Sequence, residues 1–152
     1  MSPGRYPEVV VGAVLLNAQG EIFVARFSKI AGRYAIPGGH VEYGETVADA
    51  LVRETREETG LTPVSYRLLR LGERIRPPLY KDGNHHLVYL DFVVDGWVGE
   101  LQLDGDELTD GLWMAPRAAL DLPLTDTTRQ AIESYIARGD GSVCGYQPGF
   151  VD

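Results

Sequence analysis

The order of apolar and polar residues along the chain predicts a series of short strands before the first helix. The run of β-branched and other apolar residues at 9–16 is typical of a buried strand. A turn signal at 17–20 follows, so residues 21–26 are expected to return beside that strand as a hairpin. Residues 34–36 form a third, short strand, which Pro37 and two glycines stop. Further strands are expected at residues 61–76, 85–94 and 112–115.

Helical periodicity is clearest at residues 45–59. Ala48, Leu51, Val52 and Thr55 lie at positions i, i+3, i+4 and i+7 and should form the buried stripe of that helix, which Gly60 can end in a left-handed conformation. A helical turn is predicted at residues 116–120 and a last helix at 125–137. Thr125 and Asp126 are both suitable to cap the last helix.

The alternation of strands and helices predicts an α/β (α+β) fold with a mixed sheet covered by helices. The chain has 152 residues and no internal repeat, long linker or break in composition, so a single domain over residues 1–152 is expected. The stretches at 28–33, 76–84 and 96–110 are predicted to be loops or turns. The glycine-rich tail at 139–152 is predicted to be irregular.

The charge of the chain restricts its partners. With 22 acidic and 14 basic residues the net charge is −8, which disfavours binding to nucleic acid and to anionic membranes. A phosphate-bearing substrate would need a local source of positive charge, for which a divalent cation is the obvious candidate. Cys144 is the single cysteine, the first residues have no apolar signal-peptide core, and the run at 9–16 is too short to span a bilayer. We therefore expect a soluble cytoplasmic protein.

Three carboxylates on the predicted helix suggest such a cation. At about 100° per residue, Glu54, Glu57 and Glu58 fall within an arc of about 100°. Like charges at this spacing destabilise a helix by roughly 0.2–0.5 kcal/mol per pair. A hard cation with oxygen ligands reverses the sign of that interaction. On the carboxylates alone, a plain solvated surface helix remains the alternative.

The spacing of residues from Gly39 to Leu61 resembles the Nudix box. That motif is a glycine, five residues, a glutamate, seven residues, Arg-Glu, an apolar residue, any residue, Glu-Glu, any residue, a glycine and an apolar residue. The charged and glycine positions of the motif are occupied here by Gly39, Glu45, Arg53, Glu54, Glu57, Glu58 and Gly60. Thr55 departs from the pattern, since an aliphatic residue is usual there, and the departure concerns packing more than chemistry.

The resemblance implies a Nudix-like α/β/α sandwich and an enzyme, a pyrophosphohydrolase. Such enzymes use Mg²⁺, with Mn²⁺ as a substitute, to cleave a phosphoanhydride bond in a nucleoside diphosphate derivative. Carried over by position, Glu54 and Glu58 would be the main metal ligands and Glu57 a ligand or the general base. The carbonyl group of Gly38 would add an oxygen ligand.

The resemblance also gives Arg53 and Glu45 the task of orienting the glutamates. Mg²⁺ prefers oxygen ligands and shares its coordination sphere with substrate phosphates, which agrees with this set of residues.

Candidates outside the motif each have an ordinary structural alternative. Glu107, in an acidic loop, could be a further metal-binding or catalytic carboxylate, or a solvated loop acid. Arg26 could bind a phosphate or solvate a strand end. His40 could face the metal site or pack at the entry to the helix, and Tyr80 could stack on a base or pack in the core. Asp126 could read a base edge or cap its helix.

The substrate is left open by these patterns. Pro77, which lies 16 residues beyond Leu61 (77 − 61), resembles a proline of ADP-ribose pyrophosphatases, whereas the chain length is closer to that of nucleoside triphosphate pyrophosphatases. ADP-ribose-like or nucleotide-sugar substrates and (d)NTPs are therefore both expected candidates. The alternative function is a non-catalytic nucleotide-binding sensor domain. A homodimer is plausible because relatives often form one.

Overall fold

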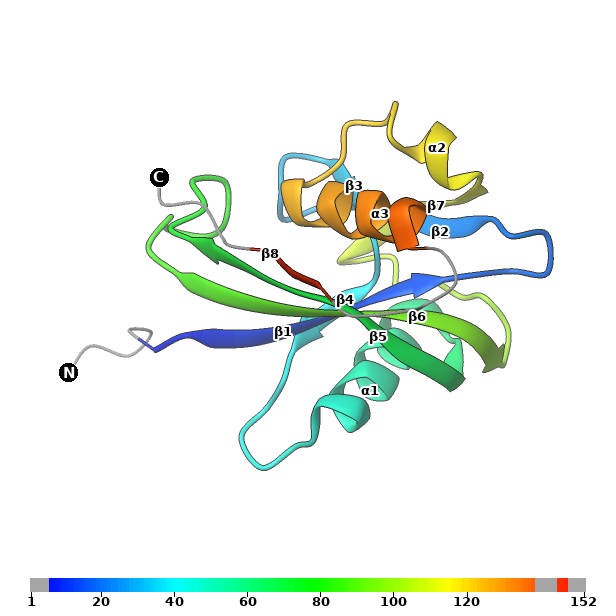
Figure 1. The fold of residues 1–152 in the computed structure, drawn as a ribbon, viewed down its shortest axis with the longest axis horizontal. Coiled ribbons are helices and arrows are strands. Elements are labelled where there is room, and N and C mark those ends of the chain that lie inside the picture. Colours follow the sequence, from blue (N-terminus) through cyan, green and yellow to red (C-terminus); the bar gives the residue numbers. More distant parts are fainter. Residues whose placement is uncertain (1–5, 139–144, 148–152) are drawn as a thin grey trace.

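A computed structural model describes residues 6–138 and 145–147 of the chain as two sheets with helices on both sides (Figure 1). The first half contains β1 (Glu8–Leu15), β2 (Ile22–Phe27), β3 (Arg33–Ala35), β4 (Gly38–His40) and α1 (Val47–Thr59). The second half contains β5 (Thr62–Ile75), β6 (His86–Val98), β7 (Leu108–Met114), α2 (Pro116–Ala119), α3 (Asp126–Arg138) and β8 (Gly145–Gln147).

The larger sheet has five strands in the order β4-β1-β6-β5-β8, and the smaller one has three in the order β3-β2-β7. The larger sheet is mixed, because β1 runs parallel to β6 while β5 runs antiparallel to it. Helix α1 lies on one side of this sheet and α3 on the other (Figure 1). The predicted mixed sheet with flanking helices is confirmed.

The predicted hairpin between the first two strands is wrong. The turn forms as expected, with the backbone amide of Asn17 donating to Glu21 at 3.0 Å. However, Leu16 and Ile22 make only an isolated bridge, and the two strands then enter different sheets. The reason is that β1 pairs along its whole length with β6 on one edge and with β4 on the other, so neither edge is free for a hairpin partner.

Two apolar cores explain why β1 is apolar at successive positions. Side chains alternate between the faces of a strand. Val11, Ala13 and Leu15 pack in one core with Leu51 of α1, whereas Val14 packs in the other with residues of α3. A strand covered on both faces therefore needs no polar residue in alternation.

Helix α1 begins two residues later than predicted, because the hydroxyl group of Thr46 caps it by accepting from the Asp49 amide at 3.0 Å. Gly60 ends the helix as expected, with φ of 78° and its N–H bonded to Arg56.

The buried stripe of α1 is rotated relative to the prediction. Leu51 and Thr55 are buried as expected, but Ala48 and Val52 are only half-buried. The residues that complete the buried face are Ala50, Glu58 and Thr59. Packing of α1 against β1, β4 and β5 selects this face, and it carries a glutamate into the protein interior.

Three further boundaries differ from the prediction. Gly38–His40 forms strand β4 on the edge of β1, although two glycines predicted a loop. Strands β6 and β7 extend into the stretch at 96–110, leaving 99–107 between them. In the tail, Gly145–Gln147 pairs with β5, so these residues are not irregular, and the rest of 139–152 lies outside the described residues. Within the described part of the chain, no helix is long and apolar enough to cross a membrane.

Candidate active site

A cavity of about 780 Å³ opens between α1 and three loops. Its floor is formed by β1 and by alternate residues of β6, namely Leu87, Tyr89 and Asp91. One wall carries Glu54, Glu57 and Glu58 of α1. The loops at 28–32, 76–85 and 99–107 contribute the rim, and Thr125, Thr127 and Thr128 at the start of α3 also line the cavity. The volume is within the usual range of small-molecule sites.

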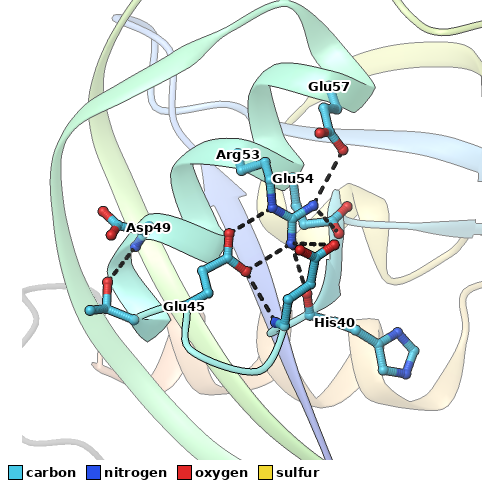
Figure 2. Close-up of polar contacts among 8 residues, drawn as sticks. His40, Glu45, Asp49, Arg53, Glu54 and Glu57 are labelled. Atoms are coloured by element: carbon cyan, nitrogen blue, oxygen red, sulfur yellow. Dashed lines mark hydrogen bonds and ion pairs between the residues drawn. The ribbon is translucent and has the colours of Figure 1, made fainter.

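Arg53 organises the carboxylates on the α1 wall (Figure 2). Its Nε and Nη2 donate to the two carboxylate oxygens of Glu45 at 2.7 and 3.0 Å. Nη1 donates to Glu54 at 2.9 Å and to Glu57 at 3.4 Å, and Nη2 also donates to the carbonyl oxygen of His40 at 3.0 Å. These bonds use the five N–H groups that a guanidinium possesses. The bond from Arg53 lowers the pKa of Glu45, which therefore stays ionised.

Glu54 lies against the backbone of Gly39. A Cβ atom at Gly39 would lie 2.2 Å from the carboxyl carbon of Glu54, so only glycine leaves room for this carboxylate. Burial raises the pKa of Glu54 even though Arg53 opposes the shift. The glycine of the motif is thus explained by a close approach of a side chain to the backbone.

Glu58 is the most buried of the three, with 3% of its surface exposed. Its Oε1 accepts from the backbone amide of Gly38 at 2.8 Å, but Oε2 is buried with no hydrogen-bond partner. Burial, supported by the charges of Glu54, Glu107 and Asp104, raises the pKa of Glu58 to about 9, against the effect of the Gly38 bond. The site therefore lacks positive charge at this atom.

Glu57 differs from its neighbours because its side chain is 57% exposed. It faces the cavity with one contact to Arg53 at 3.4 Å. An exposed carboxylate at the cavity can contact water that enters it.

The donor set fits a hard divalent cation. Among the described residues, no three His, Cys, Asp or Glu side chains converge as a ready-made ligand set. Even so, the unpartnered Oε2 of Glu58 and the mutual repulsion of the acids show where positive charge would be stabilised. Oxygen atoms are the ligands that Mg²⁺ and Mn²⁺ prefer.

Glu107 lies on the rim of the same cavity, directly before β7. Its Oε1 is 2.6 Å from Nζ of Lys29, and its charge is felt at both Glu54 and Glu58. The structure thus brings the acid of the loop to the α1 carboxylates. Sequence reasoning did not anticipate its lysine partner.

His40 and Tyr80 also line the cavity, and His40 contacts a residue that sequence reasoning missed. The carboxylate of Glu8 lies 2.9 Å from Nε2 of His40 and 2.5 Å from Nδ1 of His85. The hydroxyl group of Tyr80 is 3.3 Å from Nε2 of His40. No local signal could have identified Glu8, since it is 77 residues away from His85.

Two predicted substrate-binding residues lie outside the lining of the main cavity. Arg26 stacks over Tyr34 at 5.1 Å and pairs with Asp110 at 3.2 Å. Asp126 pairs with Arg74 at 3.2 Å and lines a neighbouring cavity of about 160 Å³. Of the two residues predicted to cap the last helix, Thr125 caps α3, because its hydroxyl group accepts from the Thr128 amide at 3.3 Å.

Comparison with known proteins places these features in a family. The sequence model of the NUDIX domain family matches residues 6–135 of this chain. The chain is 33% identical over 111 residues to the 8-oxo-dGTP diphosphatase of Escherichia coli (strain K12), covering 71% of this chain and 79% of the relative. It is 36% identical over 102 residues to the ADP-ribose pyrophosphatase of Methanocaldococcus jannaschii, covering 66% and 58% of the two chains.

The fold agrees with this assignment. A crystal structure of a MutT NUDIX hydrolase from Burkholderia pseudomallei superimposes with a TM-score of 0.76 at 28% identity, covering 86% of this chain and 98% of the other. The chain spans about half the length of several other curated relatives that it matches. The arrangement of Arg53 and its glutamates, the fold and the matched sequences together show that the chain belongs to the Nudix hydrolase family, whose relatives support pyrophosphate hydrolysis.

Proposed function

We propose that this chain hydrolyses a phosphoanhydride bond of a nucleotide with Mg²⁺ or Mn²⁺ held at the cavity carboxylates. The observation that carries the proposal is the Glu58 carboxylate, which is buried beside Glu54 with one oxygen atom unpartnered. A buried acid without compensation destabilises a fold, so its retention at a cavity wall points to a cationic ligand.

The metal ligands would be Glu54, Glu58 and the carbonyl group of Gly38, with Glu57 and Glu107 as further carboxylates at the same cavity. A bound Mg²⁺ supplies Lewis-acid polarisation of a phosphoryl group and a lowered pKa of water.

Within that arrangement we assign roles to Arg53, the Gly38 amide and Glu57. Arg53 fixes the rotamers of Glu45, Glu54 and Glu57 through four hydrogen bonds. The Gly38 amide fixes Glu58. Glu57 is exposed to the cavity and would take the proton of the attacking water, although the coupled acids can share this role.

The residues that would contact the nucleotide lie mainly on the rim of the cavity. His40 and Tyr80 line the cavity and would contact the nucleotide, whereas Arg26 and Asp126 would have to exchange their partners Asp110 and Arg74 to do so. The named relatives act on 8-oxo-dGTP and on ADP-ribose, so (d)NTPs and ADP-ribose-like or nucleotide-sugar substrates are both candidates. A cytoplasmic location, a homodimer and the absence of a nucleic-acid partner stay predictions.

The experiment is a substrate panel with product analysis. Purified protein with Mg²⁺ should release a nucleoside monophosphate from at least one of the (d)NTPs, ADP-ribose and nucleotide sugars, and hydrolysis in ¹⁸O-water would locate the broken bond.

Glu57→Gln should lower kcat by about a hundredfold or more with an unchanged Tm. Glu21→Gln is the matched control, because this half-buried residue directly before β2 does not line the cavity, and the variant should retain full activity. Nucleotide binding without product over hours would favour a sensor domain instead.

Gly39→Ala tests the packing of Glu54. The new methyl group would lie within 2.2 Å of the Glu54 carboxyl carbon, so the carboxylate must move. We expect kcat to fall by roughly ten- to a hundredfold, the range seen when residues that orient metal ligands are changed, and the affinity for Mn²⁺ to fall with it. Circular dichroism should show a folded protein. Wild-type Mn²⁺ affinity in this variant would contradict the assigned position of Glu54.

A further inference from the structure

Positive charge is distributed unevenly over the molecule. The chain has 12 arginines but only two lysines, Lys29 and Lys81. Both lysines line the main cavity, whereas Arg53 alone does so among the arginines in the described residues. In a chain with a net charge of −8, both lysine side chains therefore line the one large cavity found in the described part.

Arg53 is not available to a substrate. Each of its N–H groups already donates to Glu45, Glu54, Glu57 or the His40 carbonyl oxygen. Its role is internal to the carboxylate wall. Among the lysine and arginine side chains of the described residues that line the cavity, Lys29 and Lys81 therefore remain for direct contact with substrate phosphates.

The two lysines approach the same rim from different loops. Lys29 lies in the loop at 28–32 and Lys81 in the loop at 76–85. The ammonium group of Lys81 lies over the ring of Tyr80 at 5.1 Å, and the charge of Lys29 acts on the same tyrosine. Lys81 has a positive φ of 48°, a conformation that an L-residue adopts at a cost and that tends to persist at functional sites.

Lys29 can leave its present partner, the carboxylate of Glu107. The pair is exposed, with side-chain exposures of 65% for Lys29 and 36% for Glu107, and such pairs contribute at most about 1 kcal/mol. Because the pair is weak and Lys29 has a long and flexible stem, the Lys29 ammonium group can turn from Glu107 to a substrate phosphate at little cost.

We propose that Lys29 and Lys81 form a phosphate-binding pair for the part of the substrate that extends beyond the α1 carboxylates, and that this substrate is a nucleoside triphosphate. The inference rests on the proposed function. A nucleoside diphosphate sugar has two phosphates followed by a neutral sugar. A triphosphate adds a third phosphate carrying further negative charge, which suits two ammonium groups.

The test is equilibrium binding, which does not depend on turnover. The probes are a nucleoside triphosphate with methylene groups in place of its bridging oxygens and ADP-ribose with the same replacement, each with Mg²⁺, titrated by calorimetry at 0.1 M salt. The Lys29→Met/Lys81→Met variant should bind the triphosphate at least about tenfold more weakly, since contacts to charged groups are strong, and the ADP-ribose analogue within about twofold of wild type. Lys29→Arg/Lys81→Arg should recover most of the triphosphate affinity.

Arg117→Met is the matched control, because it removes one positive charge from an exposed position on α2 that does not line the cavity. It should leave both affinities within about twofold. Unchanged triphosphate binding in the lysine variant would overturn the proposal, and so would an equal loss for both probes. Hydrolysis of the parent nucleotides by the wild type distinguishes failure of the proposed function from failure of the phosphate-binding pair. If the wild type hydrolyses no nucleotide, the proposed function is rejected. If it does, but the lysine variant binds the triphosphate as tightly as wild type, only the phosphate-binding pair is rejected.

Discussion

The Glu58→Gln variant is expected to be more stable than the wild type and to be inactive. In the metal-free folded protein the pKa of Glu58 is about 9, against an ordinary value of 4.5. Between these two values the folded state binds more protons than the unfolded state, so wild-type stability falls as pH rises across that window. Glutamine is neutral at every pH and removes the fall. The variant should melt at least about 5 °C above wild type near pH 8 and close to wild type near pH 4.5, without divalent cations.

Divalent cations should reverse the order of stability. Binding requires the ionised carboxylate, so Mg²⁺ or Mn²⁺ should raise the Tm of the wild type and release a proton near neutral pH, whereas Glu58→Gln should show little of either effect. Its kcat should fall by about a hundredfold or more. Thermal melts over a range of pH and calorimetry in two buffers measure these quantities. A variant that melts below wild type at pH 8, or that keeps wild-type activity, would contradict the assigned environment of Glu58.

Glu133→Gln is the matched control for this experiment. Glu133 is exposed on α3 and does not line the cavity. The same chemical change there should alter Tm by only about 1–2 °C at any pH and leave the response to Mg²⁺ intact.

Asp91→Asn is expected to cause the largest loss of stability. Asp91 and Arg70 form an ion pair with 2% and 1% of their surfaces exposed, and Arg70 also donates to Gln130 at 3.0 Å. Neutralising the acid leaves the guanidinium buried without its counter-charge, which typically costs about 3–5 kcal/mol. For a chain of this length the Tm should fall by about 10 °C or more, as measured by calorimetry.

Asp95→Asn on the same strand is the comparison. Asp95 is 48% exposed and pairs with Arg67 at a distance of 3.7 Å. Loss of such a surface pair should change the free energy of unfolding by less than about 1 kcal/mol. Replacing both buried partners, as in Arg70→Met/Asp91→Leu, should cost less than Asp91→Asn, because no unpaired charge remains. Equal losses of stability in Asp91→Asn and Asp95→Asn would contradict the claim that Asp91 compensates a buried charge on Arg70.

The box was predictable because its geometry is local. Helical spacing alone puts Glu54, Glu57 and Glu58 on one side of α1, and all three line the cavity. The depth of each carboxylate was not predictable in the same way. The apolar stripe suggested that Val52 would be buried, whereas tertiary packing turned the helix so that Glu58 entered the interior instead.

Contacts between distant segments account for the rest. The Lys29–Glu107 pair joins residues 78 positions apart, and nothing in the sequence near either residue specifies its partner. The hairpin prediction for residues 9–26 was wrong for the same reason. The turn at Asn17 was recognisable, but the destination of the second strand depended on the pairing of β1 with β6. Strand β4 was missed because glycines carry no strand pattern, and it forms only because β1 offers it an edge.

The pairing of β1 with β6 also orders events while the chain is being made. Glu8 lies opposite Leu87 and Leu15 lies opposite Val94. The ribosome has therefore completed the box and helix α1 well before it reaches the strand that holds β1 in place. About thirty more residues must be synthesised after α1 before β6 is complete enough to pair with β1, and during that interval this edge of β1 has no native partner.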